Sequence, residues 1–261
     1  MDKTKLLDRL GAVGDERLLL AKVLDRAGRT QNQNIPVSTD FLSPGEQVRA
    51  ADLLRLAGIS GYVAAGGYEG AERRLFVFLP DWQEPEDAAP PVRFLRAAYR
   101  AEDSVNHRDL LGSLMGLGIV REKVGDILMG EARADLIVMD TVADFLLQNW
   151  TSAGRTRLKV SEIEASGLQP PEIRCREIRD TVSALRLDAV AASGFRTSRG
   201  KAAELIAAGR VQVNWRECAK PDKLLSEGDT VSARGLGKFR LSSVGGTTRK
   251  GRVSVVIQVY I

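Results

Sequence analysis

The segment RLDAVAASGFRTSRGKAAELIAAGRVQVN, residues 186–214, sets the fold expected for the C-terminal part of this chain. Leu187 and Val190 have the spacing of the buried face of a short helix. Thr197 or Ser198 can cap a second helix, because a hydroxyl there accepts a hydrogen bond from a free backbone N–H of the first turn. The segment therefore predicts two short helices joined by a turn.

A strand is expected directly after the second helix. Gly209 suits the left-handed conformation that commonly follows a helix C-terminus. Val211, Val213 and Trp215 alternate with polar residues, which is typical of a half-buried strand. The pattern predicts a small module of two helices and a strand.

Two bases mark the start of the second helix. Arg199 and Lys201 fall in its first turn, where cations oppose the helix dipole and anions are favoured. Bases beside unpaired backbone N–H groups therefore predict a phosphate-binding site rather than a stabilised helix end. The strands and loops that follow add three further candidates: Arg210, Lys238 and Arg240.

Positive charge is concentrated at this end of the chain. Residues 186–261 hold 14 Lys/Arg against 6 Asp/Glu, whereas the preceding 185 residues hold 24 against 28. The formal net charge of +4 thus combines a basic C-terminal module with a mildly acidic body, which indicates a polyanionic partner. The alternative is that the bases only solvate the surface, but their position at a helix start favours binding.

Composition limits the class of protein. With 261 residues, 44% of them hydrophobic, the chain is expected to form two or three domains. No apolar run reaches the roughly 18 residues of a membrane span, and the charged N-terminus is not a secretory signal, so a cytoplasmic protein without membrane insertion is expected. One histidine and two separated cysteines, Cys175 and Cys218, predict neither a metal site nor another cofactor.

The whole chain predicts an α+β protein of three parts: a helical N-terminal region at 1–60, a middle domain at 61–168 and the basic module at 180–261. Ser43–Glu46 has the pattern of a capping box. The middle domain has the pattern strand, strand, helix, strand, strand, helix, strand, which favours an RRM-like (ferredoxin-like) sandwich. These elements are expected at 75–79, 92–99, 106–117, 127–129, 136–139, 141–150 and 157–163.

Several motifs carry a family resemblance. The opening segment, followed by LLSEGDTVSARGLGKF at 224–239, resembles the S4-type RNA-binding domain. GGYEGAERR at 66–74, HRDLLGSLMGLGIVREKVGDI at 107–127 and NWTSAGRTRLKV at 149–160 look like the YlmH family. Three motifs in order at family-like spacing extend the resemblance over residues 40–261.

The resemblance implies a non-enzymatic RNA-binding protein. Some members of the family bind rRNA on the large ribosomal subunit beside peptidyl-tRNA during rescue of stalled translation; whether tRNA is contacted directly stays open. By the same resemblance Arg186, Arg199 and Lys201 face RNA and neutralise phosphates, with recognition of RNA shape rather than sequence. Cyanobacterial and chloroplast relatives bear the name photosystem II S4-domain protein, so the alternative is an assembly factor linked to photosystem II.

RRM-like architecture does not by itself imply base stacking. An RRM stacks bases on aromatic side chains of its sheet. Phe76 and Phe78 would share one strand face, but no bases flank them in that pattern, so they are expected in the core. Arg73 and Arg74 either contact RNA or solvate the end of this strand.

Two enzyme-like signals are weak. His107–Asp109 copies the start of a kinase catalytic loop but lacks its Asn, the Gly-rich loop and the DFG triplet. Arg186–Asp188 resembles the catalytic run of pseudouridine synthases, which gives an RNA-modifying alternative. The 75 residues that follow Arg186 are too few for a synthase fold, so Asp188 is expected to pair with nearby bases. No nucleotide-binding Gly pattern is present, and no enzyme is predicted.

Overall fold

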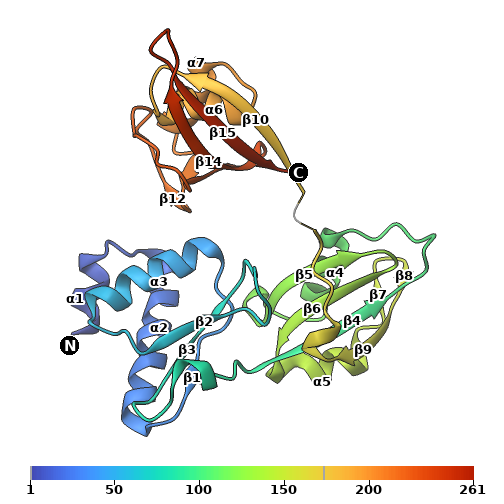
Figure 1. Ribbon diagram of the computed structural model, residues 1–261. Helices are drawn as coiled ribbons and strands as arrows, with labels where there is room; N and C mark the ends of the chain where they lie inside the picture. Colours follow the sequence, from blue (N-terminus) through green and yellow to red (C-terminus); the bar gives the residue numbers. More distant parts are fainter. Residues whose placement is uncertain (1, 173) are drawn as a thin grey trace. The chain divides into compact units, whose positions relative to one another are not determined.

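The computed structural model describes residues 2–172 and 174–261, which form two compact units, residues 1–171 and 172–261 (Figure 1). The first unit begins with three helices and a small antiparallel sheet of order β1-β3-β2. These elements are α1 (Lys3–Arg9), α2 (Gly14–Gln33), β1 (Val37–Ser38), α3 (Pro44–Leu56), β2 (Tyr62–Ala65) and β3 (Leu75–Phe78).

The predicted capping box begins α3. The backbone N–H of Ser43 donates to Glu46 Oε2 at 2.6 Å, and the Ser43 hydroxyl accepts from the Glu46 N–H at 3.4 Å. Pro44 follows the cap, where its missing N–H costs nothing. This start orients α3 so that Leu53 and Leu54 are fully buried.

The second half of this unit is the predicted RRM-like domain. Its antiparallel sheet has the order β5-β6-β4-β9, and the elements follow the sequence β-α-β-β-α-β of a ferredoxin-like fold. The elements are β4 (Val92–Ala98), α4 (His107–Gly116), β5 (Val124–Gly130), β6 (Arg133–Met139), α5 (Asp140–Asn149) and β9 (Lys159–Ile163), with a β7 (Ser152–Ala153) and β8 (Thr156–Arg157) hairpin inserted before β9. Leu95, Leu136 and Leu114 are among the residues that bury the sheet against the helices.

One strand predicted for this domain belongs elsewhere. The run LFVFL forms β3, which pairs with β1 and β2 of the N-terminal sheet and not with β4, so residues 62–78 lie outside the RRM-like sheet. All four residues of β3 are buried, because Phe76 and Phe78 face the helices while Leu75 and Val77 join a cluster with residues of β6. A strand that is buried on both faces is a continuous apolar run without alternation, so its sequence does not indicate which sheet it joins.

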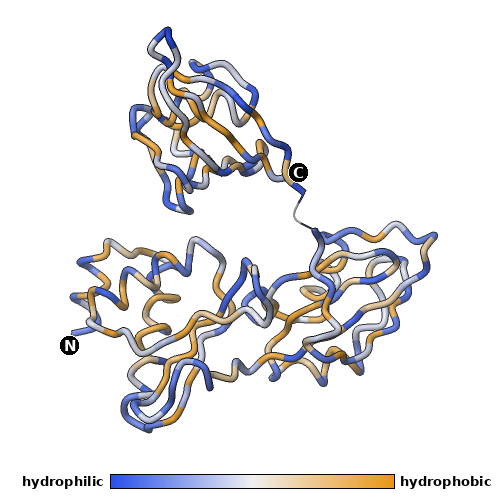
Figure 2. The backbone as a smooth tube through the Cα atoms, viewed as in Figure 1, coloured by the Kyte–Doolittle hydropathy of each residue, from blue (hydrophilic) through white to orange (hydrophobic). Residues whose placement is uncertain are grey.

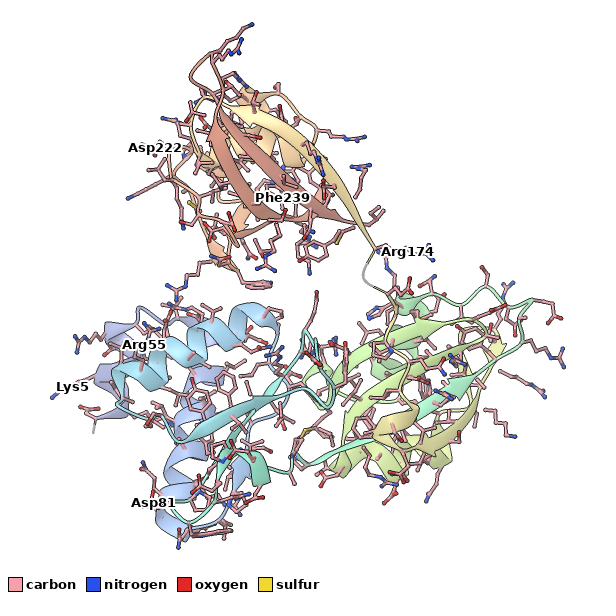
Figure 3. The ribbon with its side chains drawn as sticks, viewed as in Figure 1. Lys5, Arg55, Asp81, Arg174, Asp222 and Phe239 are labelled. Carbon is pink, nitrogen blue, oxygen red and sulfur yellow. The ribbon has the colours of Figure 1, made fainter. Side chains whose placement is uncertain are left out.

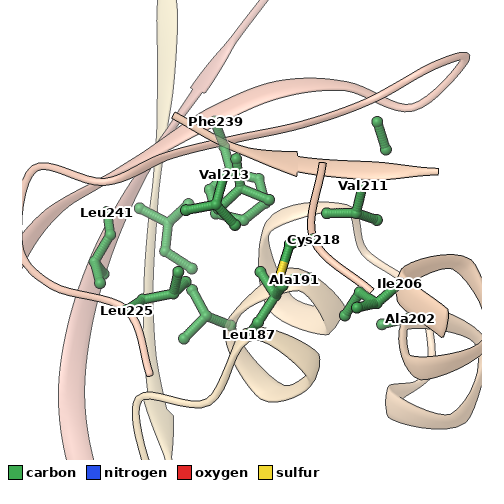
Figure 4. Close-up of a cluster of buried hydrophobic side chains, with 14 of the residues drawn as sticks. Leu187, Ala191, Ala202, Ile206, Val211, Val213, Cys218, Leu225, Phe239 and Leu241 are labelled. Atoms are coloured by element: carbon green, nitrogen blue, oxygen red, sulfur yellow. The ribbon is translucent and has the colours of Figure 1, made fainter. Parts of the chain in front are cut away.

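The second unit has one six-stranded sheet of order β10-β15-β14-β13-β11-β12 and two helices. Its elements are β10 (Cys175–Val182), α6 (Leu187–Gly194), α7 (Arg199–Ala207), β11 (Val211–Val213), β12 (Arg216–Glu217), β13 (Thr230–Ala233), β14 (Gly237–Thr247) and β15 (Val253–Tyr260). Leu187, Ile206 and Phe239 meet in its core (Figure 4). The hairpin joining β14 and β15 is hydrophilic at its tip (Figure 2).

The helix boundaries in this unit match the sequence, but Trp215 does not continue the strand. The Ser198 hydroxyl accepts from the Lys201 N–H at 3.2 Å, and Gly209 has a φ of +69°. Asn214 and Trp215 have φ values of +50° and +59° and form the two-residue turn between β11 and β12. That turn has the left-handed backbone usually supplied by Asn-Gly, which explains why the alternation stops at Val213.

The sequence also predicted that the chain neither inserts into a membrane nor holds a metal ion. Among the helices of the described residues, none is long and apolar enough to cross a membrane. The described residues also contain no cluster of His, Cys, Asp and Glu side chains that could hold a metal ion. Cys175 is exposed and Cys218 is buried, and both are free thiols.

The packing of α6 on β14 generates a stability prediction. A Cβ added at Gly194 would stand 2.5 Å from two ring carbons of the fully buried Phe239. Gly194→Ala is therefore expected to destabilise the second unit by about 1–3 kcal/mol through overpacking. Hydrogen–deuterium exchange of the full chain should show faster exchange in α6 and α7, with the first unit unchanged. Gly200→Ala in α7 is the control, since its Cβ meets nothing within 4 Å; equal exchange in the two variants would contradict the packing account.

Candidate RNA-binding surface

The centre of the candidate site is a buried carboxylate. Asp188 lies in the first turn of α6 with 7% of its side chain exposed, and its carboxylate accepts hydrogen bonds from two arginines. Arg186 donates from Nε and Nη2 at 3.2 and 3.1 Å. Arg199 donates from Nε at 3.1 Å and from Nη2 at 3.1 and 3.3 Å. One carboxylate thus brings together two predicted RNA-binding residues that lie 13 positions apart.

This arrangement sets the ionisation of the site. Burial opposes ionisation of Asp188, but the hydrogen bonds and charges of Arg186 and Arg199 outweigh burial and lower the pKa of its carboxyl. The same hydrogen bond raises the pKa of Arg186. The cluster therefore combines two guanidinium groups with one carboxylate, and its net charge is positive.

The two guanidinium groups remain accessible. The side chains of Arg186 and Arg199 are 37% and 51% exposed, and Asp188 engages only Nε and Nη2 of each. A guanidinium carries five N–H donors, so each arginine keeps donors that Asp188 does not use. Charge-assisted hydrogen bonds to phosphate are among the strongest that these donors can form.

A neighbouring loop adds two bases that the sequence analysis did not single out. The N–H of Leu187 donates to Lys223 O at 2.8 Å, and the N–H of Asp188 donates to Pro221 O at 3.0 Å. Lys220 and Lys223 are exposed on this loop, which also carries Asp222 (Figure 3). Only the backbone pairing of residues 220–225 with 185–188 reveals that these lysines lie beside Arg186.

The other predicted residues are dispersed over the unit. Lys201 is in the same helical turn as Arg199 and pairs with Glu204 at 3.2 Å, whereas Arg210 follows the opposite end of α7. Lys238 and Arg240 alternate along β14 with the buried Phe239 and so lie on the sheet face away from the helices. Lys238 Nζ lies 4.6 Å from the ring centroid of Tyr260. We use "Asp188 surface" below for Asp188, Arg186, Arg199, Lys201, Lys220 and Lys223.

In the first unit, the sheet face that an RRM uses for base stacking is closed at its centre. Phe94 of β4 and Ile137 of β6 are paired neighbours on that face. The backbone of Gly67, with a φ of +88°, lies against them so closely that a Cβ would stand 2.9 Å from the Phe94 ring and 3.0 Å from Ile137. These positions therefore have no room for a stacked base.

The same face is closed further along β4. Arg96 forms a bidentate pair with the buried Asp135 at 2.6 and 2.8 Å, and its Nη2 also donates to Gly167 O at 2.8 Å. Gln169 N–H donates to Asp135 Oδ2 at 3.2 Å, so residues 167–169 cover this pair. Any RNA contact of the domain must therefore use another surface.

Residues near β3 have structural roles. Phe76 and Phe78 are core residues, as predicted. The Arg73 guanidinium donates to Val124 O and Phe41 O, both at 3.1 Å, so neither alternative from the sequence describes it. Burial, with the charge of Arg73, lowers the pKa of Arg121 to about 10.

The enzyme-like signals also have structural explanations. Asp109 closes a capping box with Asn106 at the start of α4, with both hydrogen bonds at 3.1 Å. Asp188 is enclosed by two arginines and is not presented as a free carboxylate. Both acids of these motifs therefore serve local structure.

Comparisons with known proteins identify relatives and related domains. The family model described as "Putative RNA-binding domain in YlmH" matches residues 98–167, and the S4 domain model matches residues 185–231. The chain is 37% identical over 245 residues to "Ribosome-associated protein quality control protein P2" of Bacillus subtilis (strain 168), covering 94% of this chain and 95% of the relative. The solved structure of "Cell division protein ylmH from Streptococcus pneumoniae" is similar in fold, with a TM-score of 0.51, 19% identity, and coverage of 59% of this chain and 94% of that one.

The buried ion pairs predict a pH-dependent contribution of Asp188 to stability. Asp188→Asn removes the acceptor charge from both arginines and is expected to destabilise the second unit by about 1–3 kcal/mol at pH 7. Because the folded pKa of Asp188 is lowered, this contribution is complete above about pH 4 and is lost as pH falls through the folded value. The difference between wild type and variant should therefore shrink below pH 4.

The free energy of unfolding of the second unit can be measured by urea unfolding followed by fluorine NMR of 5-fluorotryptophan. Trp215 reports on this unit because it is the sole tryptophan of residues 172–261. Asp222→Asn, an exposed change on the adjacent loop, is the control. A difference between wild type and Asp188→Asn that stays constant from pH 7 to pH 2 would contradict the assignment.

Proposed function

Because the chain belongs to the YlmH family and carries an S4 domain, we propose that it is an RNA-binding protein whose Asp188 surface holds the phosphates of structured RNA. The observation that carries the proposal is the pair of arginines fixed by one buried carboxylate. The pairing orients both guanidinium groups before RNA arrives, so little side-chain entropy is lost on binding. Lys201, Lys220 and Lys223 supply further charge around the pair.

The RNA we propose is ribosomal. The Bacillus subtilis relative is named for ribosome-associated quality control, and 37% identity over nearly the full length of both chains supports a related role. On this proposal the protein acts in the cytoplasm and binds rRNA of the large ribosomal subunit near peptidyl-tRNA during rescue of stalled translation. Phosphate contacts position the protein, and the folded shape of the RNA gives specificity.

A binding role fits the site better than catalysis. Catalysis by Asp188 would require a substrate to reach a carboxylate whose side chain is only 7% exposed and which accepts hydrogen bonds from two arginines. The alternative of photosystem II assembly has no comparable support, since none of the matched proteins and domains reported above is named for a photosystem.

Salt dependence of RNA binding tests the proposal. Wild-type protein titrated with deproteinised large-subunit rRNA should give a slope of log K against log salt of about −3 to −5 if four to six phosphates are contacted. Arg186→Gln with Arg199→Gln keeps amide donors for Asp188 while removing both charges. It should weaken binding at least about tenfold and make the slope less negative by about two, one for each phosphate contact removed.

The matched control is Arg179→Ala with Arg234→Ala, two exposed arginines of the same unit outside the S4 match. This control removes the same charge and should leave the slope within about 0.5 of wild type. The proposed function is wrong if both double variants lose affinity equally, or if neither loses any while circular dichroism shows folded protein.

A further inference from the structure

A second basic surface lies in the RRM-like domain, far along the chain from Asp188. An open cavity of about 630 Å³ is lined by the end of β4, the loop after it and the β7–β8 hairpin. We call it the hairpin groove; its polar lining residues are Tyr99, Arg100, Asp103, Arg155, Arg157 and Lys159. The motif NWTSAGRTRLKV thus supplies three of its four bases.

The hairpin holds these bases in a row. Gly154, with a φ of +58°, and Arg155 form the two-residue turn between β7 and β8, and this left-handed first position is typical of a hairpin turn. Leu158 is buried between Arg157 and Lys159, so these two bases point away from the core. Arg155 lies at the tip of the same hairpin and also lines the groove.

The hairpin is also anchored to the domain core. Trp150, which precedes it, is almost fully buried and donates from Nε1 to Ser113 Oγ of α4 at 2.8 Å. The N–H of Leu158 donates to Thr151 O at 2.8 Å and closes the base of the hairpin. The row of bases therefore projects from a rigid support.

The charge of the groove is unbalanced. Residues 98–167 contain 8 Lys/Arg against 11 Asp/Glu, yet half of these bases line the groove with Asp103 as the one carboxylate among its lining residues. None of the four basic side chains has a salt bridge or a side-chain hydrogen bond to any described residue. In contrast, Arg93 and Arg96 of the same sheet both bind carboxylates at 2.6 Å.

We propose that the hairpin groove binds the phosphate backbone of RNA. Four bases without a salt bridge to any described residue, in an open groove, suit a polyanion that continues beyond the groove. Because the sheet face is covered and cannot stack bases, we expect this domain to hold RNA through contacts to the phosphate backbone of the RNA.

This proposal rests on the proposed function in that both surfaces bind the same RNA. The groove and the Asp188 surface lie in separate units of one chain, so binding at one raises the local concentration of RNA at the other. Two sequence-independent contacts on one chain then reinforce each other on one RNA.

The test compares Arg155→Ala, Arg157→Ala and Lys159→Ala together with a matched triple change of Arg9, Lys22 and Arg29 to Ala. The control residues are exposed bases of the same unit outside the matched RNA-binding domain. With large-subunit rRNA as the probe, the groove variant should make the salt slope less negative by about two to three. It should weaken binding at least tenfold at physiological salt, and the control should change neither.

A charge-conserving variant, Arg155→Lys with Arg157→Lys, should keep the wild-type slope and guards against a folding artefact. Wild-type affinity and slope in the triple variant would overturn the groove proposal, even where the Arg186 and Arg199 double variant loses binding. Loss in the groove variant alone would support the groove and contradict the Asp188 surface. Unchanged rRNA binding with weaker binding to intact large subunits would assign the groove to a protein partner and overturn the proposal.

Discussion

The bidentate hold of Asp188 on Arg186 and Arg199 is the interaction on which the second unit and its proposed activity depend. It joins the start of α6 to the start of α7, and the same residue's backbone N–H ties α6 to the loop at Pro221. A buried carboxylate without these partners would lose several kcal/mol of solvation, so the arrangement is maintained only while both arginines stay in place. The residues that join the helix pair are therefore the same residues that the proposed function assigns to the phosphates of RNA.

In the first unit, the sheet face on which an RRM stacks bases is covered by other parts of the chain. Its RRM-like sheet has the usual topology, but Gly67 on Phe94 and residues 167–169 over Arg96 and Asp135 close the face that commonly stacks bases. The core that joins the two sheets of the unit uses Ile137 and Met139 on this face. Apolar area used for folding is then unavailable for stacking bases, which is why we propose charged residues at the rim of the domain as its RNA contacts.

Local patterns predicted local structure well. The Ser43 capping box, the Ser198 cap and the left-handed Gly209 all follow from short-range hydrogen-bonding rules, and the structure contains each of them. The placement of LFVFL in the wrong sheet had a different origin, since strand pairing depends on contacts between distant residues. The sequence predicted that Trp215 continues the strand, but Trp215 lies in a turn. The turn was missed because its left-handed backbone is usually adopted by Gly at this position.

The candidate site was predictable to a similar degree. Arg186, Arg199 and Lys201 could be found from helix position and family resemblance, and the expected pairing of Asp188 with bases is present. Lys220 and Lys223 could not be found, because only the backbone pairing of their loop with Leu187 and Asp188 brings them to the site. Lys238 and Arg240 were predicted as part of the same site as the arginines. Their side chains alternate along β14 with the buried Phe239 and Leu241, so they lie on the sheet face away from the helices that carry Arg199.

Sucrose-gradient sedimentation from a lysate of the host organism tests the central claim most directly. Tagged wild-type protein is compared with the variant that carries Arg186→Gln and Arg199→Gln, which keeps hydrogen-bond donors for Asp188 and removes both charges. The account predicts wild-type protein in the large-subunit fractions and the variant at the top of the gradient. Wild-type protein that stays at the top in both low and physiological salt, or a variant that sediments with the large subunit as wild type does, would contradict it.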